Sequence, residues 1–254
     1  MIRRPPRSTL DRSSAASDVY KRQHKPILQK LGAKVNDPIA VPLDAKDLLP
    51  YLAKVPKSTQ QLYSIFFGSQ SVALYTQSKS MGLDKDMNRY SVLCTHESVS
   101  PKDIGGAAEG VNLLEYHPRM LKYKDTPHNR KIREIMNVDP VDAREKGSKR
   151  ILAGSHYWQV WEAVFFIQKA IEKSGWKTKK DTPDFIQALE GMKVEESFEH
   201  PQGDKYIRAK DHKAVINFHM SKVENGEIHV KNQIPASDVE KHLPARYDFT
   251  KEAF

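Results

Sequence analysis

Three short apolar runs that alternate with helix-like segments are the feature of this 254-residue chain that most restricts its fold. The runs cover residues 60–68, 88–96 and 111–118, and the segments between them cover 69–82 and 100–110. Each run is short and rich in β-formers, which is typical of strands that are buried in a parallel sheet. Because strands and helices alternate, we expect a series of βαβ units with right-handed crossovers. The sequence therefore predicts an α/β fold.

The segment 69–82 carries its own start and stop signals. Ser69 is the expected N-cap, and Gly82 stands where a helix C-terminal glycine belongs. Apolar side chains recur between them at roughly helical spacing. We therefore expect one helix between the first two strands.

The loops that follow these strands are the candidate site, because ligands in parallel sheets bind outside the carboxyl ends of the strands. The candidate ligand-binding residues are Phe67, Gly68, Ser69, Thr95, His96 and Glu97. Tyr116 to Pro118 form the third loop of the same edge. These loops offer no nucleophile, base and orienting group in register. We therefore predict no catalytic residue, no cofactor and no enzyme.

Composition excludes several other classes of protein. No run of about 18 apolar residues occurs, so a transmembrane helix and direct membrane insertion are not expected. The formal charge is +9, but six basic and two acidic residues place +4 of it in residues 1–23, and the rest is dispersed. A protein that binds nucleic acid would gather its basic residues in one patch, so we do not expect a nucleic-acid partner. The single cysteine, Cys94, and ten scattered histidines also predict no metal site.

Residues 1–23 have no helical or strand period, and their composition changes abruptly at His24. The segment resembles the translated read-through of a sequencing adaptor. We expect it to be non-native or disordered and leave it out of the predicted architecture. On this interpretation the native N-terminus, with any signal peptide, has been lost.

The remaining pattern adds strands and helices on both sides of the βαβ series. Residues 34–43 predict a strand that Pro38 interrupts and Pro42 closes, and a helix is expected to begin near Pro127. Residues 155–176 predict the longest helix, apolar on several sides and therefore buried between layers. Its residues Trp158 and Trp161 are expected to pack in a core. Asn225-Gly226 within an alternating segment predicts a β-hairpin.

Five segments together resemble a known family. They are KLGAKV at 30–35, MGL at 81–83, AAEGV at 107–111, YWQVWEAVFFIQKAIEKSG at 157–175 and YIRAKDHKA at 206–214. In their order and spacing the chain resembles the type I periplasmic substrate-binding protein of a branched-chain amino acid type ABC transporter. The resemblance covers His24 to about Pro244.

The resemblance implies two α/β lobes with parallel doubly wound sheets, joined by three crossings, with the ligand clamped between them. It assigns residues 24–118 to lobe two, 119–203 to a returning part of lobe one, and 204–254 to a crossover hairpin and C-terminal tail. The first part of lobe one is expected to be missing. It also implies a periplasmic or extracytoplasmic receptor for branched-chain or related amino acids, amides or small organic acids, with a membrane permease as partner.

Carrying the family's binding residues over to this sequence gives two positions. Phe67 stands where the family more often has tyrosine, so its ring lacks the hydroxyl that would reach a polar group. Glu97 is the only acid between Leu93 and Glu97 that would pair with a ligand ammonium. Phe67 as ordinary core and Glu97 as a charge at a helix N-terminus remain open alternatives. Amino-acid specificity is therefore not fixed.

Two other functions stay open at this point. A cytoplasmic small-molecule-sensing domain would use the same fold. A doubly wound enzyme is the second alternative, although no glycine-rich dinucleotide motif, nucleophile elbow or P-loop is present. Because one wall of the cleft is expected to be missing, we also expect that this chain does not bind its ligand with the affinity of a transporter receptor.

Overall fold

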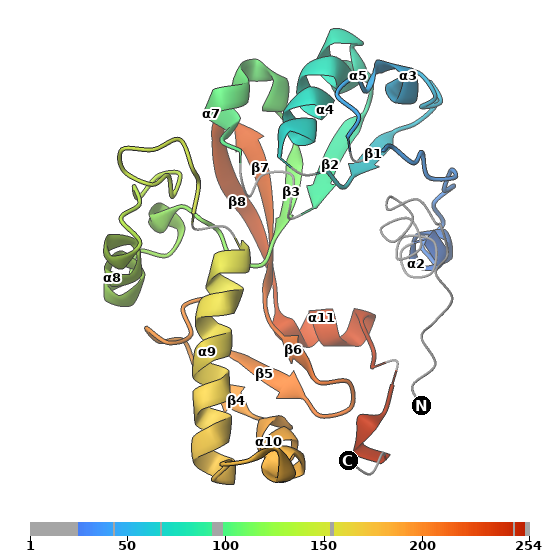
Figure 1. Ribbon diagram of the computed structural model, residues 1–254. Coiled ribbons are helices and arrows are strands. Elements are labelled where there is room, and N and C mark those ends of the chain that lie inside the picture. The colour runs from blue at the N-terminus through green and yellow to red at the C-terminus, as the bar shows by residue number, and fades with distance from the viewer. Residues whose placement is uncertain are drawn as a thin grey trace.

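The computed structural model describes residues 25–42, 44–66, 68–92, 99–152, 155–245 and 247–251. In these residues the strands form two sheets, one above the other in Figure 1. The upper sheet has five strands in the order β1-β2-β3-β7-β8, and the lower has three in the order β4-β5-β6.

The βαβ series forms as predicted. Strands β1 (Gln61–Ser64), β2 (Asn88–Val92) and β3 (Asn112–Glu115) pair in parallel, in sequence order. Helices α4 (Ser69–Ser80), α5 (Leu83–Asp86), α7 (Pro101–Ile104) and the 3-10 helix η2 (Gly105–Ala108) connect them. The edge at which β1, β2 and β3 end therefore faces the lower sheet (Figure 1).

The predicted hairpin is also present and completes this sheet. Strands β7 (Phe218–Glu224) and β8 (Glu227–Ile234) flank Asn225 and Gly226, which both have positive φ angles. That geometry is the reason for the Asn-Gly preference in tight hairpins. β7 pairs antiparallel with β3, so the sheet is mixed. One face of it packs against α3 (Leu49–Leu52), α4 and η2 in a continuous apolar core.

Local predictions in this region were partly wrong. α4 begins at Ser69, so Gly68 is the N-cap and Ser69 the first helical residue, with no side-chain cap. Gly82 does adopt the left-handed conformation, with φ of 75°. β1 is not buried but lies at the sheet edge, and Tyr63 is 42% exposed. Residues 33–42 follow α2 (Lys25–Lys30) without forming a strand.

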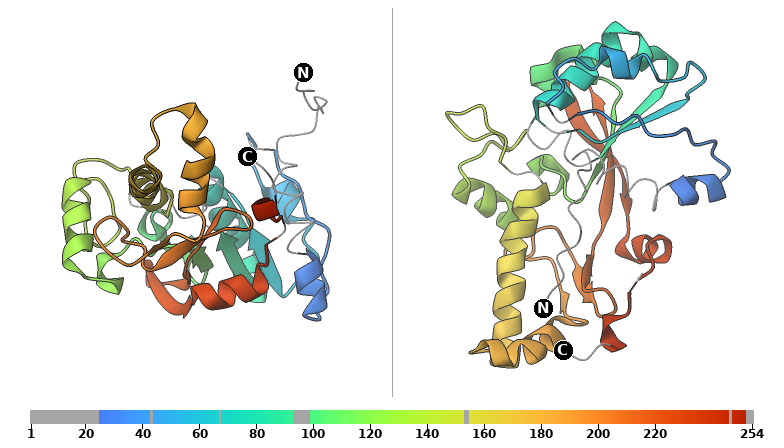
Figure 2. Two further views of the ribbon diagram at one scale, coloured as in Figure 1. Left: turned by 90° about the horizontal axis from the view of Figure 1, so that it is seen from below. Right: turned by 45° about the vertical axis from the view of Figure 1, so that its right-hand side comes forward.

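The lower sheet is small and antiparallel. Its strands are β4 (Lys193–Val194), β5 (Lys205–Arg208) and β6 (Lys213–Val215). The long helix α9 (Ser155–Ser174) runs along one side of it, and α10 (Thr182–Leu189) packs against α9 (Figures 1 and 2). The other elements here are η3 (Leu121–Tyr123), α8 (Pro127–Ile135), η4 (Lys179–Asp181), α11 (Ala236–His242) and η5 (Phe249–Lys251). Among the described helices, none is long and apolar enough to cross a membrane.

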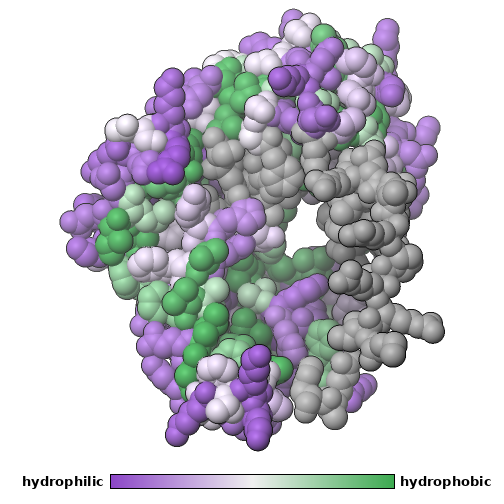
Figure 3. All heavy atoms as spheres, viewed as in Figure 1, coloured by the Kyte–Doolittle hydropathy of each residue, from purple (hydrophilic) through white to green (hydrophobic). Residues whose placement is uncertain are grey.

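The prediction that the long helix is buried between layers is wrong for the structure described. Trp158, Phe166 and Ala170 are buried on the face toward the lower sheet. On the opposite face, four apolar side chains are between 49% and 67% exposed: Tyr157, Val160, Val164 and Ile167. Figure 3 shows apolar side chains gathered along this helix. α9 is therefore covered on one side only.

The chain passes between the two sheets three times within the described residues. It leaves the upper sheet after β3, returns between β6 and β7, and leaves again between β8 and α11, which packs beside β6. The first two crossings bring the ends of β3 and β7 next to α8 and the N-terminal half of α9 (Figure 1).

Candidate functional site

Of the residues predicted to bind a ligand, the structure describes two. Gly68 has φ of 53° and precedes α4, and Ser69 opens that helix at the carboxyl end of β1. Phe67, Thr95, His96 and Glu97 lie outside the described residues, as does Cys94. The predicted site therefore remains a prediction, attached to an edge whose strands the structure does place.

Beside that edge, the junction between the two sheets contains a buried polar cluster. We use this name for His117, Arg133, Glu162, His200, Lys205 and His219. All six are buried. They come from the first two crossings, α8, α9, β5 and the loop before β5. The cluster therefore lies where the first two crossings connect the sheets.

His117 lies at the centre of this cluster, two residues after β3. Its ring makes an edge contact with Trp158, with centroids 5.0 Å apart. The guanidinium carbon of Arg133 lies 5.2 Å from the centroid of the same indole. Burial holds the pKa of His117 well below its usual value, and the nearby cations lower it further. His117 is thus a neutral side chain at neutral pH.

His219, the second residue of β7, lies where the second crossing enters the upper sheet. Its Nδ1 donates to the carbonyl oxygen of Tyr116 at 3.2 Å. Its ring makes an edge contact with the ring of Tyr123, with centroids 5.1 Å apart. Burial lowers the pKa of His219, although Glu115, its partner across the strands, opposes that shift. The Ser221 hydroxyl donates to the Glu115 carboxylate.

Arg133 fastens α8 to the first crossing. Its guanidinium donates to the carbonyl oxygens of Asn129 at 3.2 Å and of Arg119 at 2.9 Å. Burial lowers the pKa of Arg133 to about 10, which leaves it charged at neutral pH. Arg119 in turn pairs with Asp142 at 2.9 Å.

A second buried charge pair ties α9 to the lower sheet. Lys205 on β5 forms an ion pair with Glu162, whose other oxygen accepts from the backbone N–H of Gln202 at 2.7 Å. Burial raises the pKa of Glu162 and lowers that of Lys205, while their mutual attraction opposes both shifts. His200 packs against Phe166 with ring centroids 4.9 Å apart, and burial lowers its pKa to about 4.

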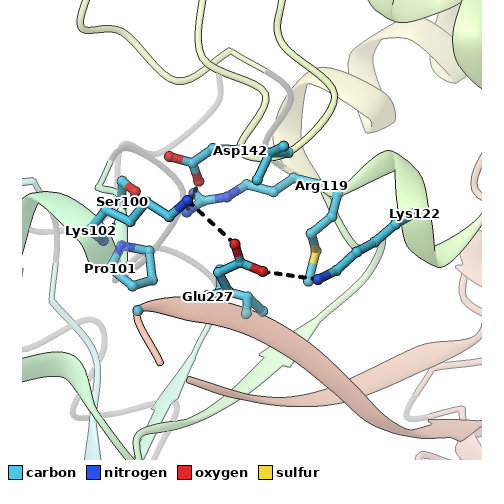
Figure 4. Close-up of a pocket in the computed structure, with 11 residues that line it drawn as sticks. Ser100, Pro101, Lys102, Arg119, Lys122, Asp142 and Glu227 are labelled. Carbon is cyan, nitrogen blue, oxygen red and sulfur yellow. Dashed lines mark hydrogen bonds and ion pairs between the residues drawn. The ribbon is translucent and has the colours of Figure 1, made fainter. Parts of the chain in front are cut away.

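A small pocket lies between α7, the β7–β8 hairpin and the segment that follows β3 (Figure 4). Its volume of about 20 Å³ is roughly that needed for one water molecule. Glu227 reaches Lys122 at 3.0 Å and Lys102 at 3.4 Å across it, and Arg119 and Asp142 form another wall. Its charges are paired with one another, so the pocket connects the hairpin, α7 and the crossing rather than presenting a free binding group.

The one carboxylate of the cluster, Glu162, is already paired with Lys205, and burial lowers the pKa of its three histidines. In the part of the chain that the structure describes, no group of three acidic, histidine or cysteine side chains could hold a metal ion. The cluster therefore connects the two sheets through buried ionisable side chains.

The sequence did not predict this cluster. One signal was available, because Glu115 and His117 continue the inward-facing positions of Leu113 along β3. Likewise His219 and Ser221 lie on the same buried face of β7 as the apolar Val223. Polar residues at core positions of a strand indicate a partner that only the tertiary structure can supply.

Comparison with known proteins identifies the fold. A family model described as periplasmic binding protein matches residues 9–227. No curated protein matches the chain.

Several solved structures share this fold. One is a solute binding protein of an ABC transporter from Rhodopseudomonas palustris HaA2 in complex with p-hydroxybenzoic acid, with 17% identity, a TM-score of 0.67, and coverage of 89% of this chain and 65% of that one. Another, from R. palustris BisB5 with 3,4-dihydroxybenzoic acid, has 21% identity, a TM-score of 0.62, and coverage of 84% and 55%. A leucine binding protein from Thermotoga maritima MSB8 has 15% identity, a TM-score of 0.62, and coverage of 89% and 65%. The chain thus spans less than two thirds of the length of these proteins.

Proposed function

The chain belongs to the periplasmic binding protein family, and from this we propose that it is the extracytoplasmic substrate-binding component of an ABC importer. The observation that carries the proposal is the family match over residues 9–227, most of the chain. Its partners would be a small organic solute and the membrane permease of the importer. In this role it binds and delivers its solute without chemical conversion.

The proposed binding surface is the edge of the upper sheet that faces the lower one. There the strands β1, β2 and β3 end, and Phe67, Gly68, Ser69, Thr95, His96 and Glu97 follow in the sequence. Ligands of doubly wound sheets bind at this kind of edge. Three crossings beside it would allow the two sheets to close on a solute.

We propose a small organic acid or amino acid as the solute. The helix α4 begins at the carboxyl end of β1, and the unpaired N–H groups at a helix start favour a carboxylate. Phe67 would pack against an aliphatic or aromatic side chain. Glu97 would pair with an ammonium group when the solute is an amino acid. The solutes of the relatives, hydroxybenzoates and leucine, are both carboxylates.

Calorimetric titration with leucine, valine, benzoate and 4-hydroxybenzoate tests this function. We expect at least one to bind, with a dissociation constant of roughly 1 mM or below. Phe67→Ala should weaken binding about tenfold, while Phe198→Ala, remote from this edge, should not. Glu97→Gln should weaken only an amino acid.

Two results would contradict the proposal. The first is the absence of binding by the folded chain to every solute at concentrations well above 10 mM. The second is turnover of a bound solute that a single substitution at this edge abolishes.

A further inference from the structure

Each of the first two crossings carries one buried histidine. His117 follows β3 by two residues, and His219 is the second residue of β7; each is 3% exposed. Both rings are enclosed by aromatic side chains from other elements, Trp158 of α9 and Tyr123 of η3. The two histidines therefore occupy corresponding places on the two chain segments that connect the sheets.

The charged groups facing these histidines are mostly cations. His117 is influenced by Arg133 of α8, Lys205 of β5, Lys124 after η3 and His219 itself. His219 is influenced by Lys124, with Glu115 of β3 as the nearby anion. A proton added to His117 would thus enter surroundings with three cations, whereas a proton added to His219 would face one cation and one anion.

The anions around the cluster already have partners. Glu162 is paired with Lys205 and accepts from the backbone N–H of Gln202. Glu196 is paired with Lys124 and lies 3.0 Å from Nε2 of His128. Glu115 accepts from the Ser221 hydroxyl. Glu162 and Glu196 are therefore already paired with cations, and Glu115 acts on His219.

We propose that the junction is an acid-sensitive hinge, in which protonation of the buried His117 and His219 places charge inside the closed junction and separates the two sheets. Burying an uncompensated charge is costly, and the junction avoids that cost by opening to water. The core of the upper sheet is apolar and holds no such titrating group. This property goes beyond solute binding and does not require the proposed function.

The direction of the pH dependence follows from the lowered pKa values. In an open junction each histidine has a pKa near 6.5, whereas in the closed junction the pKa of both is lower. The closed form binds fewer protons, so its stability is complete above about pH 6.5 and falls as the pH drops below that value. Acid therefore shifts the equilibrium toward the open junction.

Hydrogen exchange at pH 8 and pH 5, corrected for intrinsic rates, tests the proposal in the full chain. We expect the protection of the crossing segments 116–124 and 216–220 to fall about tenfold or more at pH 5. Protection of α4 should change less than about twofold, because the upper sheet stays folded. This separates junction opening from global acid unfolding, to which His200 also contributes.

The variant His117→Phe keeps an aromatic ring against Trp158 without a titratable nitrogen, and His219→Gln keeps a donor for Tyr116. Combined, they should reduce the acid effect on the crossings to less than about threefold. His242→Gln, which alters an exposed histidine on α11, should respond like the unmodified chain. Lys124→Met, which removes one cation and leaves both histidines, should give a smaller acid effect than the unmodified chain.

The proposal is overturned if the combined variant loses protection at pH 5 as the unmodified chain does. It is also overturned if α4 and the crossings lose protection together in the unmodified chain. Should the combined variant fail to fold, Lys124→Met and His219→Gln alone decide: an unchanged acid response in both would overturn the proposal.

Discussion

The upper and lower parts of the molecule are stabilised in different ways. The upper sheet rests on a continuous apolar core in which Leu74, Leu113 and Ile228 meet from α4, β3 and β8. The lower part holds α9 against its sheet with a buried ion pair and packed aromatic rings, and leaves the other side of α9 exposed. The first arrangement needs only apolar faces, which periodicity along strands and helices indicates, whereas the second needs one particular polar partner for each buried charge.

The largest effect is expected where the two parts meet. Trp158→Ala should lower the free energy of unfolding by about 4 kcal/mol, because it removes a fully buried ring that contacts His117 and Arg133. Trp161 is only partly buried and donates to the carbonyl oxygen of Phe198, so Trp161→Ala should cost about half as much. Urea titration measures both. Equal losses of unfolding free energy in the two variants would show that Trp158 does not belong to a core shared by the upper and lower parts.

Lys205→Met tests whether the lower part depends on buried charge. It leaves Glu162 buried without its cation and should destabilise the fold by about 3 kcal/mol. Adding Glu162→Leu should restore most of that loss, since neither charge is then left alone. If the double variant is no more stable than Lys205→Met, the pair is not what holds α9 in place.

A smaller effect tests the local signals of the upper part. Gly82 has a left-handed backbone, and no atom lies within 4 Å of the position that a β-carbon would take. Gly82→Ala should therefore destabilise by about 1 kcal/mol through backbone strain alone. Gly106→Ala, at a glycine without a positive φ angle, is the comparison variant. Thermal unfolding measures the loss of stability in both variants. A larger loss in Gly106→Ala would show that steric contacts, and not backbone strain, decide the effect.

The smallest effect on stability is expected on the exposed face of α9. Val160→Ser and Val164→Ser should each change the free energy of unfolding by less than about 0.5 kcal/mol. We also expect the exposed apolar face of α9 to favour self-association of the chain. Both substitutions should reduce this self-association, which sedimentation measures. A loss of more than 2 kcal/mol would mean that this face is covered in solution, and the contrast between the two parts would weaken.

The same contrast explains how much could be predicted from the sequence. The order of β1, α4, β2 and β3 and the Asn225-Gly226 hairpin follow from periodicity and turn residues close in the sequence. The strand expected at residues 34–43 does not form in the described part, 34–42, because an extended segment needs a pairing partner, which its own sequence does not specify. The exposure of α9 was missed for the same reason: an apolar face shows that a cover is favourable, but not that one is present.

Only one part of the candidate site could be predicted from the sequence. The edge that carries Gly68 and Ser69 follows from the parallel order of the strands, which sequence pattern is enough to predict. The cluster around His117 and His219 brings together residues about 100 positions apart, as the Glu115–Ser221 contact illustrates. Pairing of that kind is a tertiary property, and only the alternation along each strand hinted at it.

The pairing of β7 with β3 also has a consequence for how the chain is made. Ser221 follows Glu115 by 106 positions, and at usual rates of synthesis roughly 5–20 s separate the emergence of the two strands from the ribosome. During that interval β1, β2 and β3 can assemble, but the outer edge of β3 has no neighbour. Exposed strand edges recruit other chains. The nascent protein is therefore most prone to aggregate after β3 has formed and before its hairpin arrives.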